Sequence, residues 1–253
     1  MYKNERFKII LEELYKHKSV QVKLLSDKFG VSMETIRRDL EELEEQHYLK
    51  RIYGGAVALK KNIQAQNFIE RKNVYTKEKQ MLAKKCVHLV KEGDFIAFDA
   101  STTNTTIAQE FMNHFKHLTV LTNDLLNAQL IAINTKWTVL FPGGEINNNE
   151  LFVGGASTIE YINQFQIDKF FMSISGFTPE IGFMDYGFQE YEIKMAMFRN
   201  SNQVYVAADH HKFGQHAMIK ICQVDQVNGV ITDNKIDKEI ITFFEENKYP
   251  LYF

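Results

Sequence analysis

Apolar positions near the N-terminus recur every three or four residues, which is the spacing of helices with one buried side. We therefore predict three short helices, over residues 4–16, 22–29 and 31–49. Gly30 separates the last two, at a position where a left-handed residue commonly ends a helix. Two helices joined by a turn of this kind form a helix-turn-helix, whose second helix enters the major groove of DNA.

The predicted helix over residues 31–49 has an apolar stripe on one side and two arginines away from it. Ser32 is placed to cap this helix, Arg37 flanks the stripe, and Arg38 lies more nearly opposite it. Arginine can bind guanine edges bidentately, and serine or threonine can bind phosphates or bases. A surface helix with solvated arginines is the alternative. We predict DNA contacts from this helix by Ser32, Thr35, Arg37 and Arg38.

Two short strands are predicted directly after this helix. The pattern indicates a strand over Lys50–Tyr53, a tight turn at Gly54-Gly55 and a return strand over residues 56–59. A wing of this kind beside a helix-turn-helix fits contact with the DNA backbone or the minor groove. The predicted contacts, at the base of the wing, are Lys50, Arg51 and Tyr53, with plain solvation as the alternative for the two cations.

Residues 60–85 carry many more basic than acidic side chains. The pattern indicates a linker that runs into a helix over about residues 76–91. We favour a solvated spacer with a minor electrostatic role over direct phosphate contacts. The chain is thus predicted to hold a winged helix-turn-helix domain over 1–57, a linker over 58–75 and a second domain over 76–253.

Beyond Asp94 short apolar runs alternate with helical patterns, which predicts an α/β domain with a mostly parallel sheet covered on both faces. Ligands of such sheets bind outside the carboxyl ends of the strands. The predicted strands cover residues 95–98, 118–121, 137–141, 170–174, 204–208 and 230–232, and two later helices cover 188–198 and 238–247.

Small polar groups follow several of these strands, and we predict that they bind an effector. A helix that begins after Asp99 offers hydroxyls and N–H groups to an anion. A carboxylate for sugar hydroxyls, beside hydroxyls and a lysine for phosphate, suits a phosphorylated sugar. Ordinary helix capping and turn formation is the alternative, and for Lys194 it is a solvated surface position. The predicted effector-binding residues are Asp99, Ser101, Thr102, Thr103, Thr122, Asn123, Gly143, Gly144, Lys194, Asp209 and Lys212.

Composition narrows the classes of function. A formal net charge of -2 over 253 residues excludes a general polyanion binder, so any nucleic-acid site must be local. The two cysteines are read as reduced thiols, and no apolar run reaches the roughly 18 residues of a membrane span, so we expect a cytoplasmic protein without membrane partners. His210, His211 and His216 lack a completing ligand set other than Asp209, so no metal and no cofactor is predicted.

The run VSMETIRRDLEELEEQHYLKRIYGGA resembles the helix-turn-helix and wing of the DeoR family of bacterial transcriptional regulators. Later runs resemble the sensor domain of that family, which is similar to ribose-5-phosphate isomerase-like folds. The resemblance implies a homo-oligomeric repressor of a carbohydrate operon that binds operator DNA and is modulated by a phosphorylated sugar. The family usually has Gly where Ser101 stands, and a Cβ there narrows the approach to phosphate. The later runs are FDASTTNTTIA, LTND, FPGGE, FVGGAS, DKFFMSISGF and YVAADHHKFG.

Two alternatives stay open from the sequence. The first is a sugar-phosphate isomerase with a DNA-binding head, whose acid–base candidates are Asp99, Asp209 and Lys194. The second is a regulator whose pocket is vestigial, which Ser101 would explain.

Overall fold

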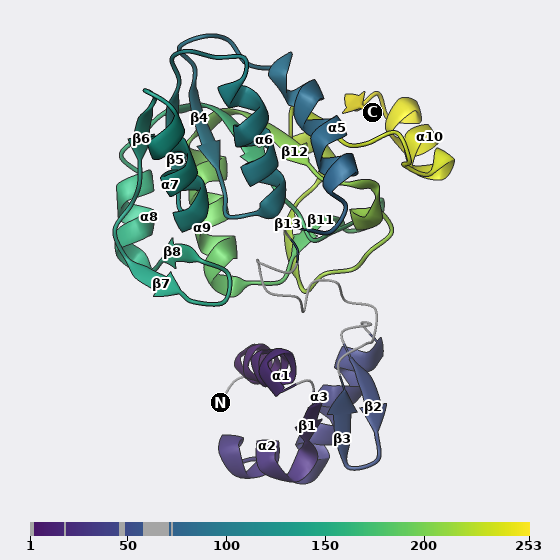
Figure 1. The fold of residues 1–253 in the computed structure, drawn as a ribbon. Helices are drawn as coiled ribbons and strands as arrows, with labels where there is room; N and C mark the ends of the chain where they lie inside the picture. Colours follow the sequence, from purple (N-terminus) through teal and green to yellow (C-terminus); the bar gives the residue numbers. More distant parts are fainter. Residues whose placement is uncertain (1–2, 18, 46–48, 58–70, 72) are drawn as a thin grey trace. The chain divides into compact units, whose positions relative to one another are not determined.

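A computed structural model describes residues 3–17, 19–45, 49–57, 71 and 73–253 of the chain. The chain divides into two compact units, residues 1–66 and 67–253 (Figure 1). None of the described helices is long and apolar enough to cross a membrane. The predicted linker over 58–75 remains a prediction, because most of its residues lie outside the described ones.

The described part of the N-terminal unit has three helices and a three-stranded sheet in the order β1-β3-β2 (Figure 1). Apolar residues of all three helices are buried together, including Leu14, Leu25, Ile36 and Leu40. The elements are α1 (Lys3–His17), β1 (Ser19–Gln21), α2 (Val22–Phe29), α3 (Met33–Glu45), β2 (Lys50–Ile52) and β3 (Gly55–Val57).

The predicted helix-turn-helix is present, with Gly30 in the left-handed region (φ 65°) as the C-cap of α2. Two details of the wing differ from the prediction. Ser19–Gln21, between the first two predicted helices, form strand β1, which was not predicted and which pairs antiparallel with β3. The turn falls at Tyr53-Gly54, because Ile52 pairs with Gly55. Gly55 lies in strand β3 and pairs with Gln21 of β1. This position requires glycine, because an added Cβ would lie 1.9 Å from the Val20 carbonyl oxygen.

A buried ion pair joins α1 to α3. Arg6 donates from Nε to Asp39 Oδ2 at 2.6 Å and from a terminal nitrogen to Oδ1 at 2.9 Å. The two side chains are only 11% and 4% exposed. A bidentate pair fixes orientation as well as distance, so it sets how α3 lies on α1.

The C-terminal unit is built on a seven-stranded sheet in the order β15-β14-β12-β9-β4-β5-β6. Each neighbouring pair in this sheet is parallel. The strands are β4 (Phe95–Phe98), β5 (Thr119–Thr122), β6 (Thr138–Leu140), β9 (Ile167–Met172), β12 (Ser201–Ala207), β14 (Gly229–Ile231) and β15 (Leu251–Tyr252). The predicted mostly parallel sheet is therefore confirmed, with β15 as a strand that the prediction omitted.

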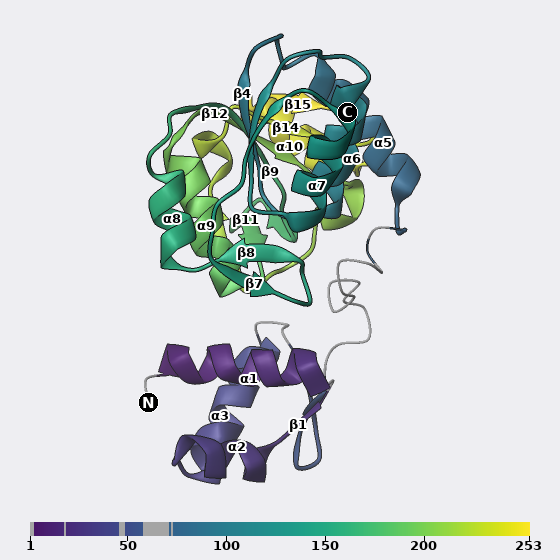
Figure 2. The ribbon, with the colours of Figure 1, turned by 60° about the vertical axis from the view of Figure 1, so that its left-hand side comes forward.

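Helices cover both faces of this sheet, as alternation of strands and helices predicts (Figures 1 and 2). On one face Ile96, Phe98 and Val120 pack with residues of α5 (Thr76–Val87), α6 (Thr102–Met112) and α7 (Leu125–Asn134). On the other face Ala97 and Leu121 belong to a cluster with residues of α8 (Ala156–Ile162), α9 (Phe188–Arg199) and α10 (Lys238–Glu246).

Two smaller β elements add to this unit, and the sequence patterns did not predict them. One is the antiparallel hairpin of β7 (Glu145–Asn147) and β8 (Phe152–Gly154). The other is a three-stranded sheet of β10 (Gly176–Thr178), β11 (Gly182–Asp185) and β13 (Ile219–Cys222). Their strands are only three or four residues long, too short for a period of two to stand out.

The order of the large sheet defines where a ligand should bind. From β4 the chain adds β5 and β6 on one side, whereas β9, β12, β14 and β15 lie on the other. The connections therefore change direction between β4 and β9. In open parallel sheets the crevice at such a switch point, beyond the carboxyl ends of the strands, is the usual binding site.

Replacing Asp39 by Ala should lower the free energy of unfolding of the N-terminal unit by about 3 kcal/mol, because the buried Arg6 guanidinium then loses its bidentate carboxylate. Urea unfolding of the full chain measures this. Glu42→Ala is the matched control, because Glu42 also joins α3 to α1, through an exposed pair with Lys3. A surface pair contributes only about 0–1 kcal/mol. Equal effects of the two substitutions would show that the Arg6–Asp39 pair does not hold the unit together.

Candidate functional site

The start of α3 has the cap and the exposed arginines that the sequence predicts. Ser32 Oγ accepts a hydrogen bond from the Thr35 N–H at 3.1 Å and lies 2.9 Å from the Thr35 hydroxyl. Ile36 and Leu40 are buried, and this fixes the opposite side of the helix outward. The side chains of Arg37 and Arg38 are 60% and 77% exposed. The structure thus presents these arginines to a partner.

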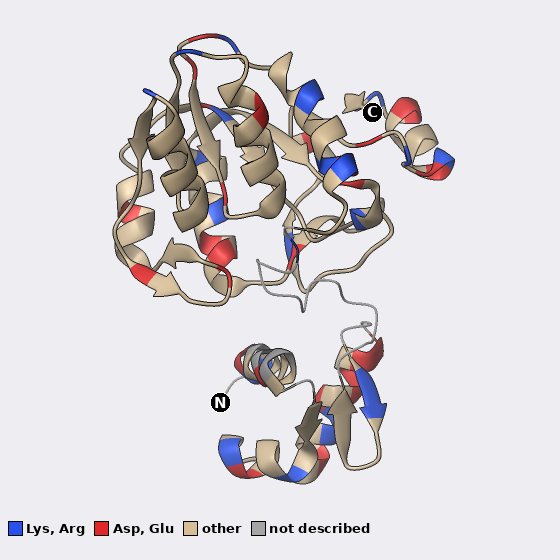
Figure 3. Cartoon of the chain, in the orientation of Figure 1, with Lys and Arg blue, Asp and Glu red and all other residues tan. Residues whose placement is uncertain are grey.

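Acidic residues accompany the basic ones in this unit, so the two signs are interleaved along its elements (Figure 3). Glu34 lies 3.3 Å from Arg37 and 3.8 Å from Arg38. These exposed pairs are weak, because solvent screens them and the side chains lose freedom. Both guanidinium groups are therefore available to a stronger anion.

The wing residues are less uniform than predicted. Lys50 is exposed, but Arg51 pairs with Glu44 at 2.7 Å and Glu41 at 3.2 Å. The hydrogen bond from Arg51 lowers the pKa of the Glu44 carboxyl. Tyr53 was predicted at the base of the wing, but it lies in the terminal turn of the wing and is fully exposed. It is therefore placed to reach outward, whereas Arg51 must exchange a carboxylate for a phosphate.

At the switch point the ends of β4 and β9 are joined by a buried carboxylate. Asp99 Oδ1 accepts hydrogen bonds from the Ser173 N–H at 2.9 Å and the Asn104 amide at 2.8 Å. Asp99 Oδ2 accepts one from the Ser173 hydroxyl at 2.5 Å. Asp99 thus closes the carboxyl ends of two neighbouring strands and holds the first turn of α6.

Lys194 lies in the same group, and the solvated alternative for it is wrong. Its side chain is 2% exposed, and its ammonium lies 2.9 Å from Asp99 Oδ2 and 2.5 Å from Asp185 Oδ2. The two carboxylates raise the pKa of Lys194 although burial opposes this. Ser175 donates to the other oxygen of Asp185 at 2.6 Å. Because two carboxylates neutralise it, Lys194 is a structural cation of the site.

The loop before α6 holds the hydroxyl residues and the helix start that were predicted to bind an anion. Ser101 Oγ caps the helix by accepting from the Asn104 N–H at 3.0 Å. Thr102 and Thr103 follow in the first turn, and all three hydroxyl residues are buried. The N–H groups of a helix start attract anions. The Ser101 side chain serves the cap, so a residue with a Cβ has a defined role in this loop.

Lys79, which the sequence pattern placed in the predicted helix over about residues 76–91 without a binding role, lies directly beside this loop. The Lys79 ammonium donates to the carbonyls of Arg71 and Val74, each at 2.8 Å, and to Thr102 Oγ1 at 2.9 Å. The side chain is buried, and burial lowers the pKa of Lys79 to about 8, against the attraction of Asp209. Lys79 is therefore a member of the site.

Lys79 and Lys212 share one electrostatic property. Among the described residues neither ammonium has a carboxylate within ion-pair distance. Burial lowers the pKa of Lys212 as well, and Asp209 is the anion that most opposes the shift. Asp209 itself is buried and accepts from the His211 N–H at 3.1 Å. Buried charges in proteins are normally paired, so these two lysines leave room for an anion.

Acidic groups lie near these cations. Glu150, between β7 and β8, pairs with Arg71, whose buried Nε has no acceptor within the described part of the chain. Burial and the neighbouring charges of Asp185 and Glu150 raise the pKa of Glu190 to about 8. Arginine and carboxylate together can bind hydroxyl groups of a polyol, because they supply both donors and acceptors.

The end of β5 is close to the hairpin. Thr122 Oγ1 accepts from the Asp124 N–H at 3.2 Å, and Asn123 donates from its amide to the Val153 carbonyl at 3.2 Å. Asp124 caps α7, and burial raises its pKa to about 6. The oxygen of the Asn123 amide is buried without a partner in the described structure. Asn123 therefore retains an acceptor for a ligand.

Gly143 and Gly144, which were predicted to bind the effector, have a structural role in the fold. The Gly143 carbonyl accepts from the Thr158 hydroxyl at 2.9 Å. Gly144 has φ 155°, and an added Cβ would lie 2.3 Å from the Gly154 carbonyl oxygen. Their described contacts are with α8 and β8, so these glycines shape the hairpin and are not joined to the Asp99 group.

The side chains of His210 and His211, in the loop after β12, have partners within the protein. His210 Nδ1 lies 2.8 Å from Asp233 Oδ1, and the His211 ring stacks on Tyr75 with centroids 3.5 Å apart. Within the described residues no three metal-ligating side chains gather at one point. The rings therefore fasten the loop after β12 to Tyr75 and to the end of β14.

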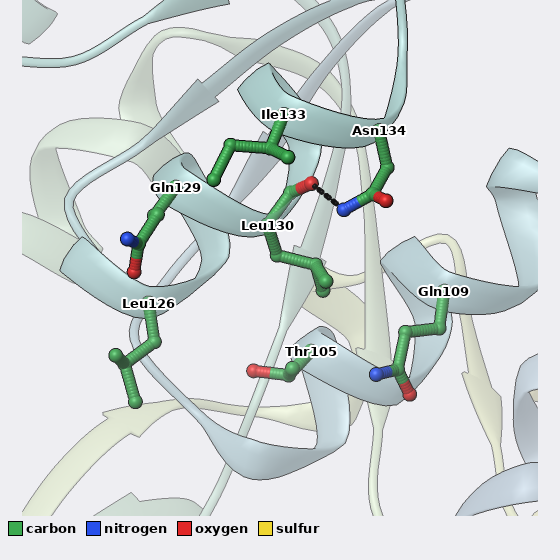
Figure 4. Close-up of a pocket in the computed structure, with 7 residues that line it drawn as sticks. All are labelled: Thr105, Gln109, Leu126, Gln129, Leu130, Ile133 and Asn134. Atoms are coloured by element: carbon green, nitrogen blue, oxygen red, sulfur yellow. Dashed lines mark hydrogen bonds between the residues drawn. The ribbon is translucent and has the colours of Figure 1, made fainter.

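A separate cavity of about 250 Å³ lies between α6 and α7 (Figure 4). Its apolar lining comes from Leu126, Leu130 and Ile133, and its rim carries amide and hydroxyl groups from Thr105, Gln109, Gln129 and Asn134. No lining residue is charged. Because phosphate is bound by cations and helix starts, this cavity is not the anion site.

Sequence reading found the strand-end residues and missed the residues that complete the site. Asp185 lies in a β element that the patterns did not predict, Arg71 lies in the predicted linker, and Lys79 lies in the predicted helix that follows it. Asn104, Asp124 and Ser173 stand inside the quoted runs FDASTTNTTIA, LTND and DKFFMSISGF. Their place in these runs is the sequence signal by which the three residues could have been identified.

Comparison with known proteins gives two family matches. Residues 6–62 match the DeoR-like helix-turn-helix domain, and residues 74–234 match the DeoR C terminal sensor domain. The chain belongs to the DeoR family of transcriptional regulators. A DNA-binding regulator with a sensor domain, and not an isomerase, is thereby the class of this protein.

Relatives of this DeoR-family chain cover nearly its whole length. The HTH-type transcriptional regulator GolR of Listeria innocua is 34% identical over 99% of this chain and 98% of its own. The glycerol-3-phosphate regulon repressor of Escherichia coli is 30% identical over 92% of each. A solved structure of ribose 5-phosphate isomerase A from Methanocaldococcus jannaschii matches with a TM-score of 0.40 and 16% identity over 53% of each chain.

Replacing Lys194 by Met should lower the free energy of unfolding of the C-terminal unit by about 3–5 kcal/mol at pH 7, because Asp99 and Asp185 lose the cation between them. The cation lowers the pKa of Asp185 in the native protein, so the stability from that pair is present at neutral pH and is lost as pH falls. The deficit of the variant should therefore shrink as pH falls below about 4, the ordinary pKa of an aspartate.

Urea unfolding at pH 7 and at lower pH measures this difference. Lys169→Met is the control, because Lys169 pairs with the single carboxylate Asp94 near the opposite end of β9 and β4. A smaller loss is expected there. A deficit for Lys194→Met that does not change with pH would contradict the proposed charge balance.

Proposed function

We propose that this DeoR-family protein represses a carbohydrate-metabolism operon and responds to a phosphorylated sugar or polyol. The single observation that carries the effector class is that the buried ammonium of Lys79 and the partly buried side chain of Lys212 both lack a carboxylate partner in the described structure. They lie with Asp209 at the carboxyl ends of parallel strands, beside a helix start. A phosphate there would pair both charges.

The other end of the effector is proposed to bind the neighbouring carboxylates and amides. Asn123 has a free acceptor, and Glu150 and Glu190 lie near Arg71. Such groups recognise hydroxyls, so the site suits a ligand with a phosphate at one end and hydroxyls at the other. The name of the Escherichia coli relative refers to glycerol 3-phosphate, which belongs to this class of compound.

Operator binding is proposed for the outward face of α3 and for the wing. Arg37 and Arg38 are placed to contact base edges or phosphates, with Ser32 and Thr35 beside them. Lys50 and Tyr53 are exposed in the wing, and Arg51 joins them by leaving its carboxylates. We further propose that the protein is a cytoplasmic homo-oligomer that binds symmetric half-sites.

The Arg38→Ala variant should weaken operator binding by about 1–3 kcal/mol if Arg38 contacts a base edge. Titration of a labelled operator fragment at fixed salt measures the loss. Lys23→Ala is the control, because Lys23 is an exposed cation of α2 outside the predicted contact set. If the Arg37/Arg38 double alanine variant binds the operator as well as the native protein, α3 is not the recognition helix.

Affinity for a sugar phosphate should fall as pH rises through 8. The pKa of Lys79 is about 8 without a ligand, so the ammonium that pairs with phosphate is lost above that pH, and binding there takes up a proton. If only the protonated form binds, affinity at pH 9 should be about tenfold lower than at pH 7.

Isothermal titration with glycerol 3-phosphate, fructose 1-phosphate and glucose 6-phosphate at several pH values measures this dependence. Lys79→Met should weaken binding and remove the step, whereas Lys84→Met, an exposed lysine of the same helix, should keep both. A thermal-shift screen in which no phosphorylated compound stabilises the native protein would favour a vestigial pocket.

A further inference from the structure

The segment that precedes α5 is fastened to the site at three points. We call Arg71 together with residues 73–75 the connector, because in sequence these residues follow the N-terminal unit and lead into α5. The Lys79 ammonium binds two of its carbonyls, Arg71 pairs with Glu150, and Tyr75 stacks on His211. Each of the three partners belongs to a different element of the effector site.

The Lys79 ammonium is the contact that an effector must change. It has three N–H donors, and these are directed to the carbonyls of Arg71 and Val74 and to the hydroxyl of Thr102. Thr102 is the first residue of α6, where the predicted anion would lie. A phosphate at this helix start can therefore bind Lys79 only if the ammonium gives up at least one of these acceptors.

The two carbonyls are the acceptors that the ammonium can leave. The bond to Thr102 lies within the anion loop, so a phosphate there can bind the hydroxyl and the ammonium together. The carbonyls are neutral, and a charged oxygen is a stronger acceptor than a neutral one. The Arg71 carbonyl also accepts a hydrogen bond from the Val74 N–H at 3.2 Å. After the ammonium has left, this long hydrogen bond would remain between the two residues.

The other two fastenings support the same coupling. Arg71 has a buried Nε without an acceptor in the described structure, so its guanidinium retains capacity for a ligand oxygen. Tyr75 has φ 54°, a left-handed conformation that costs free energy for a residue other than glycine. A conformation of this kind persists only while its surroundings hold it, so it is disposed to change when contacts of the connector are lost.

We propose that Lys79 couples the effector site to the connector: a phosphate at the start of α6 draws the ammonium away from the carbonyls of Arg71 and Val74 and so releases the segment that leads from the DNA-binding unit. Lys79 is thus a positioning residue of the regulatory response as well as a ligand of the anion. This inference rests on the proposed function, because it needs an anion at that helix start.

Hydrogen–deuterium exchange of the full-length protein tests the coupling in two arms. In the first arm no ligand is present, and Lys79→Met is compared with Lys84→Met. Loss of the ammonium should raise exchange of the Val74 amide and its neighbours about tenfold, as loss of one hydrogen bond would. The control variant should exchange like the native protein. If Lys79→Met leaves connector exchange unchanged, Lys79 does not hold the connector and the inference is wrong.

In the second arm the native protein is saturated with whichever of glycerol 3-phosphate, fructose 1-phosphate or glucose 6-phosphate it binds. A separate sample contains inorganic phosphate. Exchange should fall at residues 101–105 and rise in the connector. Slower exchange at 101–105 without any rise in the connector would overturn the coupling and leave the proposed effector class standing. Binding of none of these probes would overturn both.

A readout of function separates coupling from simple loss of binding. Lys79→Met should show weakened operator binding without effector, because its connector is already released, and effector should change that binding little. If Lys79→Met instead binds operator as tightly as the native protein without effector, the released connector does not reach the DNA-binding unit and the inference fails.

Discussion

The ammonium of Lys194, buried between Asp99 and Asp185, is the interaction on which the sensor unit depends most. It neutralises two carboxylates at the point where the chain changes direction in the sheet, and so allows the ends of β4 and β9 to meet with their polar groups satisfied. Without this cation the two buried carboxylates would repel each other. The anion loop, which begins at Asp99, has its position set by this cluster.

This arrangement divides the cations of the site into two kinds. Lys194 has its counter-charges within the protein, so it holds the framework in the absence of any ligand. Lys79 and Lys212 have none among the described residues, so they are the cations that a bound anion is proposed to pair. A sensor needs both: a rigid base for the strand ends, and charges that remain unsatisfied until the effector binds.

The extent to which sequence predicts this molecule follows from the range of the interactions involved. Periodicity and capping are local, so they predicted α2, α3 and the wing, and the alternation of apolar runs predicted the parallel sheet. The hydroxyl residues Ser101 and Thr102 were found because a strand end and a helix start adjoin in sequence. Lys79 was predicted to lie in a helix but was not assigned to the site, since nothing in its own neighbourhood shows that its partners are carbonyls of a preceding turn. Asp185 was missed because its contact with Lys194 depends on tertiary packing.

The pairing of Arg51 with Glu41 and Glu44 has a consequence for how binding responds to salt. A cation that is free in solution releases condensed counterions from DNA when it docks on a phosphate. If Arg51 contacts DNA as proposed, it exchanges one anion for another and leaves the two carboxylates to attract cations of their own. The number of basic side chains in the proposed contact then exceeds the number of ions released, so the wing would contribute more to fit than to the salt dependence of affinity.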